Sequence, residues 1–233
     1  MTGSGATMGT NLKELDPFVE SQIDALDIDD GRPLIITDAD EVLFQFMAGL
    51  EDFINGRGLM FDWSSFALTG NIRDAKSGEA LEPADVKDFL AEFFDERTVD
   101  LVPVDGAADA LKRLSKQAQV VVLSNVPEAA IADRITCLTQ HEMPYPLIAN
   151  IGPKGPAVRA LLASRDRPAV FIDDIPHNHK SVADHSANVL RLHFIAHPRL
   201  AAMLGPAEYS DRRLVSWTEI ETTIGEHFAN AGY

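Results

Sequence analysis

The stretch Leu34-Ile35-Ile36-Thr37-Asp38-Ala39-Asp40 joins an apolar run to a pair of acids, and it decides how the rest of the chain is interpreted. Gly31 and Pro33 precede the run, whose β-branched, hydrophobic character is typical of a parallel strand buried on both faces. In α/β proteins, the carboxyl ends of such strands open onto the ligand-binding crevice. Two acids at that point repel each other unless a cation or phosphoryl chemistry occupies the site. A solvated turn rich in aspartate is the alternative.

Three later apolar runs also end in polar side chains. The runs and the residues that follow them are 119–123 with Ser124 and Asn125, 147–151 with Lys154, and 169–172 with Asp173 and Asp174. The repeated alternation of strands and helices predicts a parallel sheet covered on both faces. We therefore expect these polar side chains to meet at one edge of that sheet.

In chain order, the motifs Asp-x-Asp, Ser, Lys and Asp-Asp resemble the four motifs of the haloacid dehalogenase superfamily of hydrolases, and they span residues 38–174. The resemblance implies an α/β fold, a Rossmann-like parallel sheet core with a small helical cap inserted after the first motif. It also implies a Mg²⁺-dependent phosphatase that hydrolyses a small phosphorylated metabolite through an aspartyl-phosphate. The four motifs together are specific, although each one alone is weak.

The resemblance assigns complementary roles to the first two acids. Asp38 matches the nucleophile that attacks phosphorus, which splits one difficult displacement into two easier ones. Asp40 matches the general acid that protonates the leaving group and then acts as a base on water. Family members that act on carbon–halogen bonds lack an acid at this second position, so Asp40 favours phosphoryl transfer. A capping or turn role is the alternative for Asp40.

The next two motifs match residues that handle the phosphoryl group. Ser124 matches the hydroxyl that hydrogen-bonds this group, and Asn125 would add its backbone N–H. Serine is also a good helix N-cap, and both roles of Ser124 can hold at once. Lys154 matches the lysine that offsets negative charge on the nucleophile and the phosphoryl oxygens. An ordinary surface lysine beside a Gly-Pro turn is the alternative for Lys154.

The last motif matches the acids that bind metal. Mg²⁺ prefers oxygen ligands in octahedral geometry. By resemblance, Asp38, the backbone carbonyl of Asp40 and Asp173 are direct ligands. Asp174 would act through water or orient a neighbour.

Two positions depart from the family pattern. Glu41 stands where many members have glycine, which makes the turn after the second acid less free. His177 stands where many members have another acid, a loss that the Asp-Asp pair covers. His177, His179 and His185 suggest a solvated helix end more than a zinc site, because no cysteine or second cluster supports zinc.

The pattern of elements divides the chain into a core and an insertion. We expect residues 1–43 and 101–233 to form the core domain and residues 44–100 to form the cap. The insertion should be mainly helical, with one helix over 42–54 and another opening at Pro83. Helical caps exclude water and select substrates. Arg73 and Lys76 could meet a substrate anion there, and exposed loop cations are the alternative.

Four further helices of the core have recognisable signals. They are a leading helix over 11–28, one capped by Asp105, one over 127–138 with Ile131, Ile135 and Leu138 on its apolar face, and a last helix opened by a capping box of Ser216 with Glu219.

The bulk properties limit the partners. With 20 basic and 36 acidic residues among 233, the net charge of −16 would repel nucleic acids and anionic membranes. A bound divalent cation can still dominate the field in one cleft. No apolar run approaches the roughly 20 residues that cross a bilayer, and the first ten residues lack a secretory signal. Cys137 is the only cysteine, expected to be a buried, inert thiol, which agrees with a cytoplasmic location. We expect a small phosphorylated substrate and a monomer or homodimer.

Two rival interpretations belong to other functional classes. A catalytically silent binding or regulatory protein could use the same scaffold, although the intact Asp38, Asp40, Lys154 and Asp173 argue against it. A phosphorylation-switched receiver domain also combines acids, a hydroxyl and a lysine. In receivers the lysine comes last, whereas here Lys154 precedes Asp173, and the long insertion disfavours a receiver as well.

Overall fold

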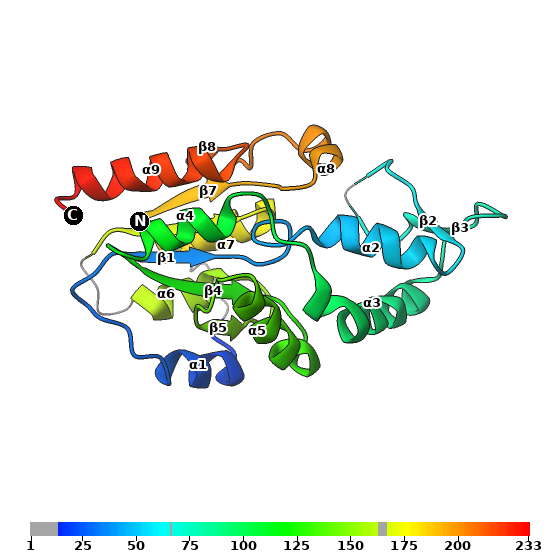
Figure 1. Cartoon of the computed structure of the whole chain (residues 1–233), viewed down its shortest axis with the longest axis horizontal. Coiled ribbons are helices and arrows are strands. Elements are labelled where there is room, and N and C mark those ends of the chain that lie inside the picture. The colour runs from blue at the N-terminus through cyan, green and yellow to red at the C-terminus, as the bar shows by residue number, and fades with distance from the viewer. Residues whose placement is uncertain (1–13, 66, 163–166) are drawn as a thin grey trace, which may run out of the picture.

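A six-stranded parallel sheet forms the centre of the computed structural model, which describes residues 14–65, 67–162 and 167–233 (Figure 1). The strand order is β5-β4-β1-β6-β7-β8. The strands are β1 Leu34–Thr37, β4 Gln119–Ser124, β5 Leu147–Ala149, β6 Ala169–Asp173, β7 Val189–His193 and β8 Arg212–Arg213. Because β1 pairs in parallel with both β4 and β6, the carboxyl ends of these three strands are neighbours. The predicted α/β class with a parallel sheet is confirmed.

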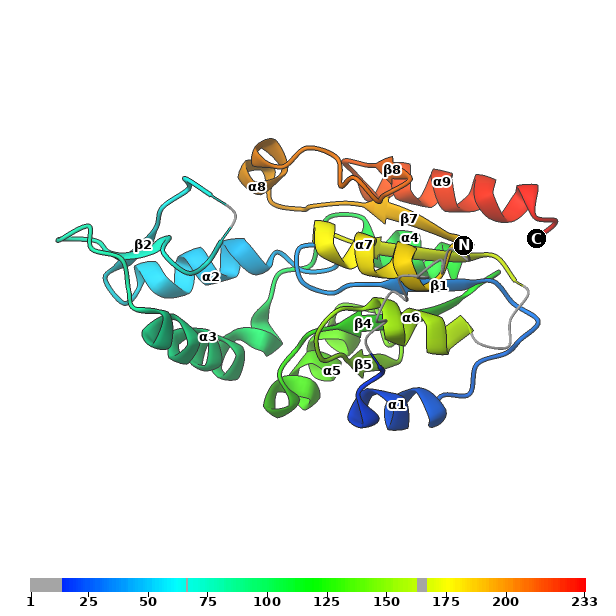
Figure 2. The same cartoon turned by 180° about the vertical axis from the view of Figure 1, so that it is seen from behind.

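Helices cover both faces of the sheet (Figures 1 and 2). One layer contains α1 Pro17–Asp24, α6 Gly155–Leu162 and α7 Pro176–His185. The other contains α4 Ala107–Leu114, α5 Ile131–Gln140 and α9 Trp217–Asn230. Successive residues of β1 serve the two layers in turn, since Leu34 and Ile36 join the first apolar cluster and Ile35 joins the second. This double burial explains why β1 is apolar without alternation.

The chain leaves the core directly after β1. The excursion contains α2 Phe46–Asn55, β2 Leu59–Phe61, β3 Ile72–Asp74, α3 Pro83–Arg97 and the 3₁₀ turn η1 Thr98–Asp100. These elements form a lobe beyond the carboxyl end of β1 (Figure 1). The insertion is mainly helical, as the sequence predicts, but β2 and β3 pair as an antiparallel hairpin that its pattern did not reveal. Each strand has only three residues, too few to display a period of two.

Several boundaries differ from the sequence-based expectation. The leading helix was expected over 11–28, but α1 is shorter: Asp16 caps it and Pro17 opens it. It ends at Asp24, and its last turn contains no basic residue that would stabilise the negative end of the helix dipole. Residues 1–13, which include the tail and the start of the predicted helix, lie outside the described residues. Helix α2 begins at Phe46 rather than at Val42.

Two helix starts test the predicted caps. The N-cap of α4 is Gly106 with φ of 80°, not Asp105, because that left-handed backbone suits a residue without a Cβ. The serine half of the predicted capping box of α9 is confirmed, since Ser216 Oγ accepts a hydrogen bond from the Glu219 N–H at 3.2 Å. The Glu219 carboxylate accepts the Val215 N–H at 3.0 Å instead of the Ser216 N–H. The remaining elements are η2 Glu128–Ala130 and α8 Pro198–Met203. Among the described residues, the helices are all too short or too polar to cross a membrane.

Candidate active site

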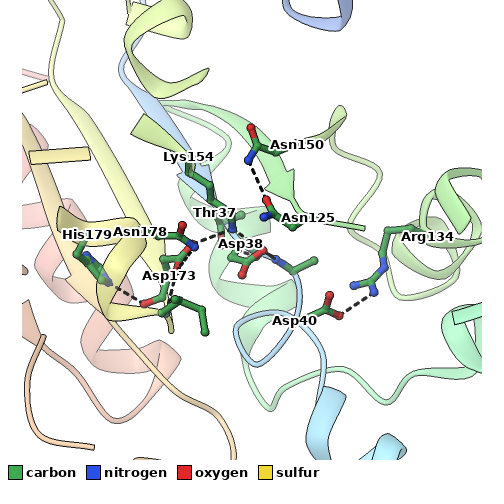
Figure 3. A network of polar contacts seen from close by, with 12 residues as sticks. Thr37, Asp38, Asp40, Asn125, Arg134, Asn150, Lys154, Asp173, Asn178 and His179 are labelled. Atoms are coloured by element: carbon green, nitrogen blue, oxygen red, sulfur yellow. Dashed lines mark hydrogen bonds and ion pairs between the residues drawn. The ribbon is translucent and has the colours of Figure 1, made fainter. Parts of the chain in front are cut away.

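Lys154 links the two central strands of the sheet. Its Nζ lies 2.7 Å from Oδ1 of Asp38, just after β1, and 2.8 Å from Oδ2 of Asp173, at the end of β6 (Figure 3). The lysine side chain is almost fully buried. Burial alone would lower the pKa of Lys154, but Asp173 and Asp38 raise it above the usual value. The lysine is therefore a fixed ammonium between two carboxylates, not a surface residue.

Asp38 presents one engaged and one open carboxylate oxygen. Besides Lys154, its Oδ1 accepts the Ala39 N–H at 2.7 Å. Its Oδ2 has no hydrogen bond within the described parts of the chain. Burial raises the pKa of Asp38, and the neighbouring Lys154 opposes that rise. Such an oxygen, held in position by its partner oxygen, is suited to nucleophilic attack.

Asp173 is engaged on both oxygens. Its Oδ1 accepts hydrogen bonds from the Ile175 N–H at 2.8 Å and from Nδ2 of Asn178 at 3.0 Å. Its Oδ2 accepts from Lys154 at 2.8 Å and from the same Asn178 amide at 3.2 Å. The backbone carbonyl of Asp173 contacts Nε2 of His179 at 3.0 Å. Asp173 therefore acts as an anchor that orients Lys154.

Asp174, the next residue, differs from Asp173 in having no side-chain hydrogen bond within the described residues. Asp38, Asp173 and Asp174 bring carboxylate oxygens within 4.8 Å of one another, and all three side chains are buried. Burial, followed by repulsion from Asp173 and Asp38, raises the pKa of Asp174 well above its usual value. One lysine cannot neutralise three acids, so the donor set fits a hard divalent cation.

The histidines near this site do not form a zinc site with it. Burial lowers the pKa of His179 to about 4, which keeps the imidazole neutral near pH 7. Within the described residues, the group of three acids is the one cluster with metal-binding geometry, and it contains no histidine. The predicted solvated helix end is wrong for His179, whose side chain is fully buried, whereas His177 is exposed.

Asp40 is paired with a buried arginine that the sequence motifs do not include. Nη2 of Arg134, from α5, lies 2.7 Å from Oδ1 of Asp40, and the two side chains are turned toward each other (Figure 3). Arg134 is fully buried, and its guanidinium lies 5.3 Å from the centre of the Phe44 ring. Burial raises the pKa of Asp40, while the Arg134 charge opposes that rise. Nε and Nη1 of Arg134 have no hydrogen-bond partner among the described residues.

Ser124 ends β4 with its hydroxyl buried and unsatisfied. The side chain has no exposed surface, and Oγ has no hydrogen-bond partner in the described structure. It is not an N-cap, because η2 starts at Glu128 after Pro127. The next residue, Asn125, accepts from Nδ2 of Asn150 at 2.8 Å and donates to the Gly152 carbonyl at 3.0 Å (Figure 3). The Asn125 side chain thus fixes the loop that carries Lys154.

Glu41 fixes the junction between the core and the inserted segment. Its φ is 59°, a left-handed value that glycine usually adopts and that is costly for a residue with a Cβ. Its buried carboxylate accepts the Met47 N–H in the first turn of α2 and the His197 N–H before α8, both at 2.7 Å. Burial raises the pKa of Glu41 to about 7. These two hydrogen bonds offset the backbone strain.

A pocket of about 260 Å³ connects these groups to solvent. Its polar lining includes Asp38, Asp40, Asn125, Lys154, Asp174, His177 and Asn178, and its apolar lining includes Phe46, Met47, Leu68, Ile175 and Leu200. Two other pockets, of about 330 and 220 Å³, contain none of the strand-end residues. We therefore take the pocket beside Asp38 as the candidate active site.

The structure does not bring Arg73 to this pocket. Arg73 lies on β3, where its Nε donates to Oδ2 of Asp62 at 2.9 Å and its Nη1 donates to the Gly78 carbonyl at 3.1 Å. Lys76 follows β3 in an exposed turn. Both cations thus occupy the hairpin rather than the lining of the pocket.

Several residues of the site escaped the sequence analysis. The sequence does not point to Arg134, because its pattern predicts Ile131, Ile135 and Leu138 as the apolar face of that helix. Ile135 is in fact 48% exposed, and Arg134 is buried with Cys137 and Leu138. The available signal was that Arg134 lies three residues after Ile131 and four before Leu138, so a charge shares their helical face. Asn178 follows His177 and carried no signal of its own.

The sequence alone finds no counterparts, since no protein-family model and no curated protein matches it. Solved structures do match. A haloacid dehalogenase-like hydrolase from Streptococcus pneumoniae aligns with a TM-score of 0.53 at 12% identity, covering 82% of this chain and 97% of that one. A protein from Thermotoga maritima assigned as a β-phosphoglucomutase aligns with a TM-score of 0.55 at 14% identity, covering 83% and 99%.

An L-2-haloacid dehalogenase gives a TM-score of 0.53 at 11% identity, covering 84% of this chain and all of the other. These neighbours span most of the chain and are haloacid dehalogenase-like hydrolases. At such low identity the likeness establishes the fold, which is the one that the four motifs predict. Because the neighbours include both dehalogenases and phosphoglucomutases, the reaction must be argued from the residues of the site.

Proposed function

We propose that this protein is a Mg²⁺-dependent phosphatase that hydrolyses a small phosphorylated metabolite through an aspartyl-phosphate on Asp38. One observation carries the proposal: Asp38 has an oxygen fixed by Lys154 and an open oxygen, and it shares its pocket with a second acid, Asp40. A nucleophile, a fixed cation and a proton donor are the parts that phosphate monoester hydrolysis requires.

The residues would divide the reaction as follows. Oδ2 of Asp38 attacks phosphorus, a new phosphorus–oxygen bond forms, and the bond to the leaving alkoxide breaks. Asp40 gives that oxygen its proton, so an alcohol departs. Asp40 then removes a proton from water, which attacks the aspartyl-phosphate and releases inorganic phosphate and Asp38. Lys154 neutralises charge near Asp38 throughout, and the unsatisfied Ser124 hydroxyl is available as a donor to the phosphoryl group.

The buried acids support a metal at this site. Asp38, Asp174 and the backbone carbonyl of Asp40 would hold Mg²⁺, which supplies charge neutralisation for an anionic nucleophile and an anionic substrate. The hydrogen bonds of Asp173 favour a changed assignment for the last two acids. The Asp173 carboxylate accepts four hydrogen bonds, whereas that of Asp174 accepts none within the described residues, so Asp174 becomes the proposed direct ligand and Asp173 the orienting residue.

The inserted lobe is the proposed cap, over residues 44–100. It contributes Phe46, Met47 and Leu68 to the lining of the pocket. Glu41 ties its first helix to the core, so the lobe is held over Asp38 at its base. A lobe in this position can exclude water and contact the leaving group.

Dehalogenation and a silent scaffold are the competing functions. A haloacid carries a carboxylate, and Lys154, the pocket's lysine, is already paired with two acids. A silent scaffold has no use for three buried carboxylates around one lysine, an arrangement that costs stability unless a ligand compensates it. Both arguments favour phosphoryl transfer.

The test is hydrolysis of p-nitrophenyl phosphate with and without Mg²⁺, together with chloride release from 2-chloropropionate. We expect phosphate release that needs the metal, no chloride release, and a fall of several orders of magnitude in Asp38→Asn. Asp184→Asn, which removes an exposed acid paired with Lys180, serves as the charge-matched control and should keep wild-type turnover. Metal-independent activity, or an active Asp38→Asn variant, would contradict the mechanism.

A further inference from the structure

The outer part of the candidate site is apolar. Phe46, Met47 and Leu68 reach it from the inserted lobe, and Ile175 and Leu200 reach it from the core. Phe46, Leu68 and Ile175 are half-buried, so their remaining exposed surface faces a cavity that leads to Asp38. Burying such surfaces against a ligand is favourable only if the ligand is apolar where it meets them.

The cations near the pocket are all committed. Lys154 is paired with two acids, and Arg134 is paired with Asp40. Arg199, next to Leu200, lies 3.6 Å from Oε1 of Glu51, with its guanidinium 5.1 Å from the Trp63 ring centre. Among the described residues, no unpaired lysine or arginine lines the pocket. A second anionic group on a substrate would therefore lie near the acids Asp40 and Glu41 and would find no unpaired lysine or arginine in the lining.

The size of the pocket sets a further limit. Its volume of about 260 Å³ is slightly below the roughly 300–1,000 Å³ typical of sites for drug-sized ligands. The phosphoryl group must occupy the polar end beside Asp38 and Lys154. The part of the leaving group that lies inside the apolar part must therefore be compact.

We propose that the substrates are phosphate monoesters of compact, uncharged and mainly apolar alcohols, selected by Leu68 and its apolar neighbours against substrates with a second anionic group. This inference rests on the proposed phosphatase function and names the substrate class for that same site. Leu68 is a specificity-determining residue, because it touches the leaving group and takes no part in the transfer step.

Three isosteric substrates test the inference at pH 8. They are 3-methylbutyl phosphate, 3-(phosphonooxy)propanamide and 3-(phosphonooxy)propanoate, which place an isopropyl, amide or carboxylate group at the same distance from phosphorus. With Mg²⁺ present, we expect kcat/KM to decrease in that order. The carboxylate should be about 10- to 100-fold worse than the isopropyl compound, because its charge stays unpaired.

A pair of variants separates a local effect from a change in net charge. Leu68→Arg adds a cation to the lining and should raise kcat/KM for the carboxylate at least about tenfold relative to the isopropyl compound. Ala67→Arg adds the same charge at the neighbouring exposed residue, which does not line the pocket, and should leave the ratio unchanged.

The outcomes distinguish this inference from the function on which it rests. Wild-type protein could hydrolyse p-nitrophenyl phosphate and show equal kcat/KM for the carboxylate and the isopropyl compound. In that case the proposed substrate class is wrong and the proposed phosphatase function stands. An equal shift of the ratio in both arginine variants would also overturn the role of Leu68. If none of the phosphate esters is hydrolysed with Mg²⁺, the proposed function fails and this inference fails with it.

Discussion

The guanidinium of Arg134 lies 2.7 Å from the carboxylate of Asp40, and the two groups differ greatly in exposure: the Asp40 side chain is 23% exposed and Arg134 is fully buried. The two partners therefore differ in what their loss costs, because removing Arg134 leaves a partly exposed charge unpaired and removing Asp40 leaves a fully buried one unpaired. An unpaired Asp40 can still reach water through the pocket. An unpaired Arg134 cannot, since its Nε and Nη1 already lack partners in the described structure.

The first prediction concerns the stability of this pair. Asp40→Asn should lower the free energy of unfolding by about 3–5 kcal/mol, because it leaves a buried guanidinium without a counter-charge. Asp38→Asn should be nearly neutral or stabilising, since it removes one of several clustered acids. Urea unfolding of both variants without metal measures the difference. If Asp40→Asn lost as little stability as Asp38→Asn, Arg134 would have to find another partner.

The second prediction assigns the metal ligands by their different partners. Asp174→Asn should abolish the Mg²⁺-dependent rise in stability, which for wild-type protein is about 2.7 kcal/mol when Mg²⁺ is at 100 times its Kd. Without metal this variant should be at least as stable as wild type, because repulsion with Asp173 is relieved. Asp173→Asn should instead be destabilised without metal, since it weakens the hold on Lys154. Thermal unfolding with and without Mg²⁺ tests both, and the reverse pattern would restore Asp173 as the direct ligand.

The strand-end motifs could be predicted because their geometry is set by short stretches of sequence. An apolar run such as Leu34–Thr37 specifies a buried strand, and parallel neighbours bring Asp38, Lys154 and Asp173 to one edge. The partners of these residues depend on longer-range packing. Glu41 meets His197, 156 positions away, and no local pattern carries that contact.

The apolar character of the pocket is also a property of the assembled fold. Leu68 and Leu200 lie on the inserted lobe and on the core respectively, and each resembles an ordinary core residue in the sequence. Arg73 is the converse case, because its charge predicts a substrate contact, whereas it does not line the pocket. Its pairing with Asp62 across the β2–β3 hairpin was hidden because the hairpin itself was not predicted.

The third prediction is a pH dependence of stability that comes from Glu41. Its folded-state pKa of about 7 lies above the ordinary value of 4.5, so the native state holds the proton more tightly than the unfolded chain. The stabilisation from this proton is complete below about pH 4.5 and is lost as the pH rises to 7. From these two pKa values, the loss is about 3 kcal/mol.

A matched variant isolates this contribution from those of other titrating groups. Glu41→Gln cannot titrate, so the difference in unfolding free energy between wild type and variant should shift by about 3 kcal/mol between pH 4.5 and 8. The variant gains relative to wild type as the pH rises, although it loses one of the two N–H bonds at every pH. Glu92→Gln, on an exposed part of α3, is the control for replacing a surface glutamate by glutamine. A difference that stays constant with pH would exclude Glu41 as the titrating group.

The last prediction separates function from stability at Ser124. Its hydroxyl is buried without a partner among the described residues, so it contributes no hydrogen bond to the fold. Removing an unsatisfied buried group is neutral or stabilising, and Ser124→Ala should therefore unfold at the same or a higher urea concentration than wild type. If the hydroxyl donates to the transferring phosphoryl group, turnover of p-nitrophenyl phosphate should nevertheless fall by about 10- to 100-fold. Ser124→Thr, which keeps the hydroxyl, should retain more of that activity than the alanine variant. Wild-type turnover in Ser124→Ala would remove Ser124 from the site, and a large loss of stability would show that the hydroxyl has a structural partner.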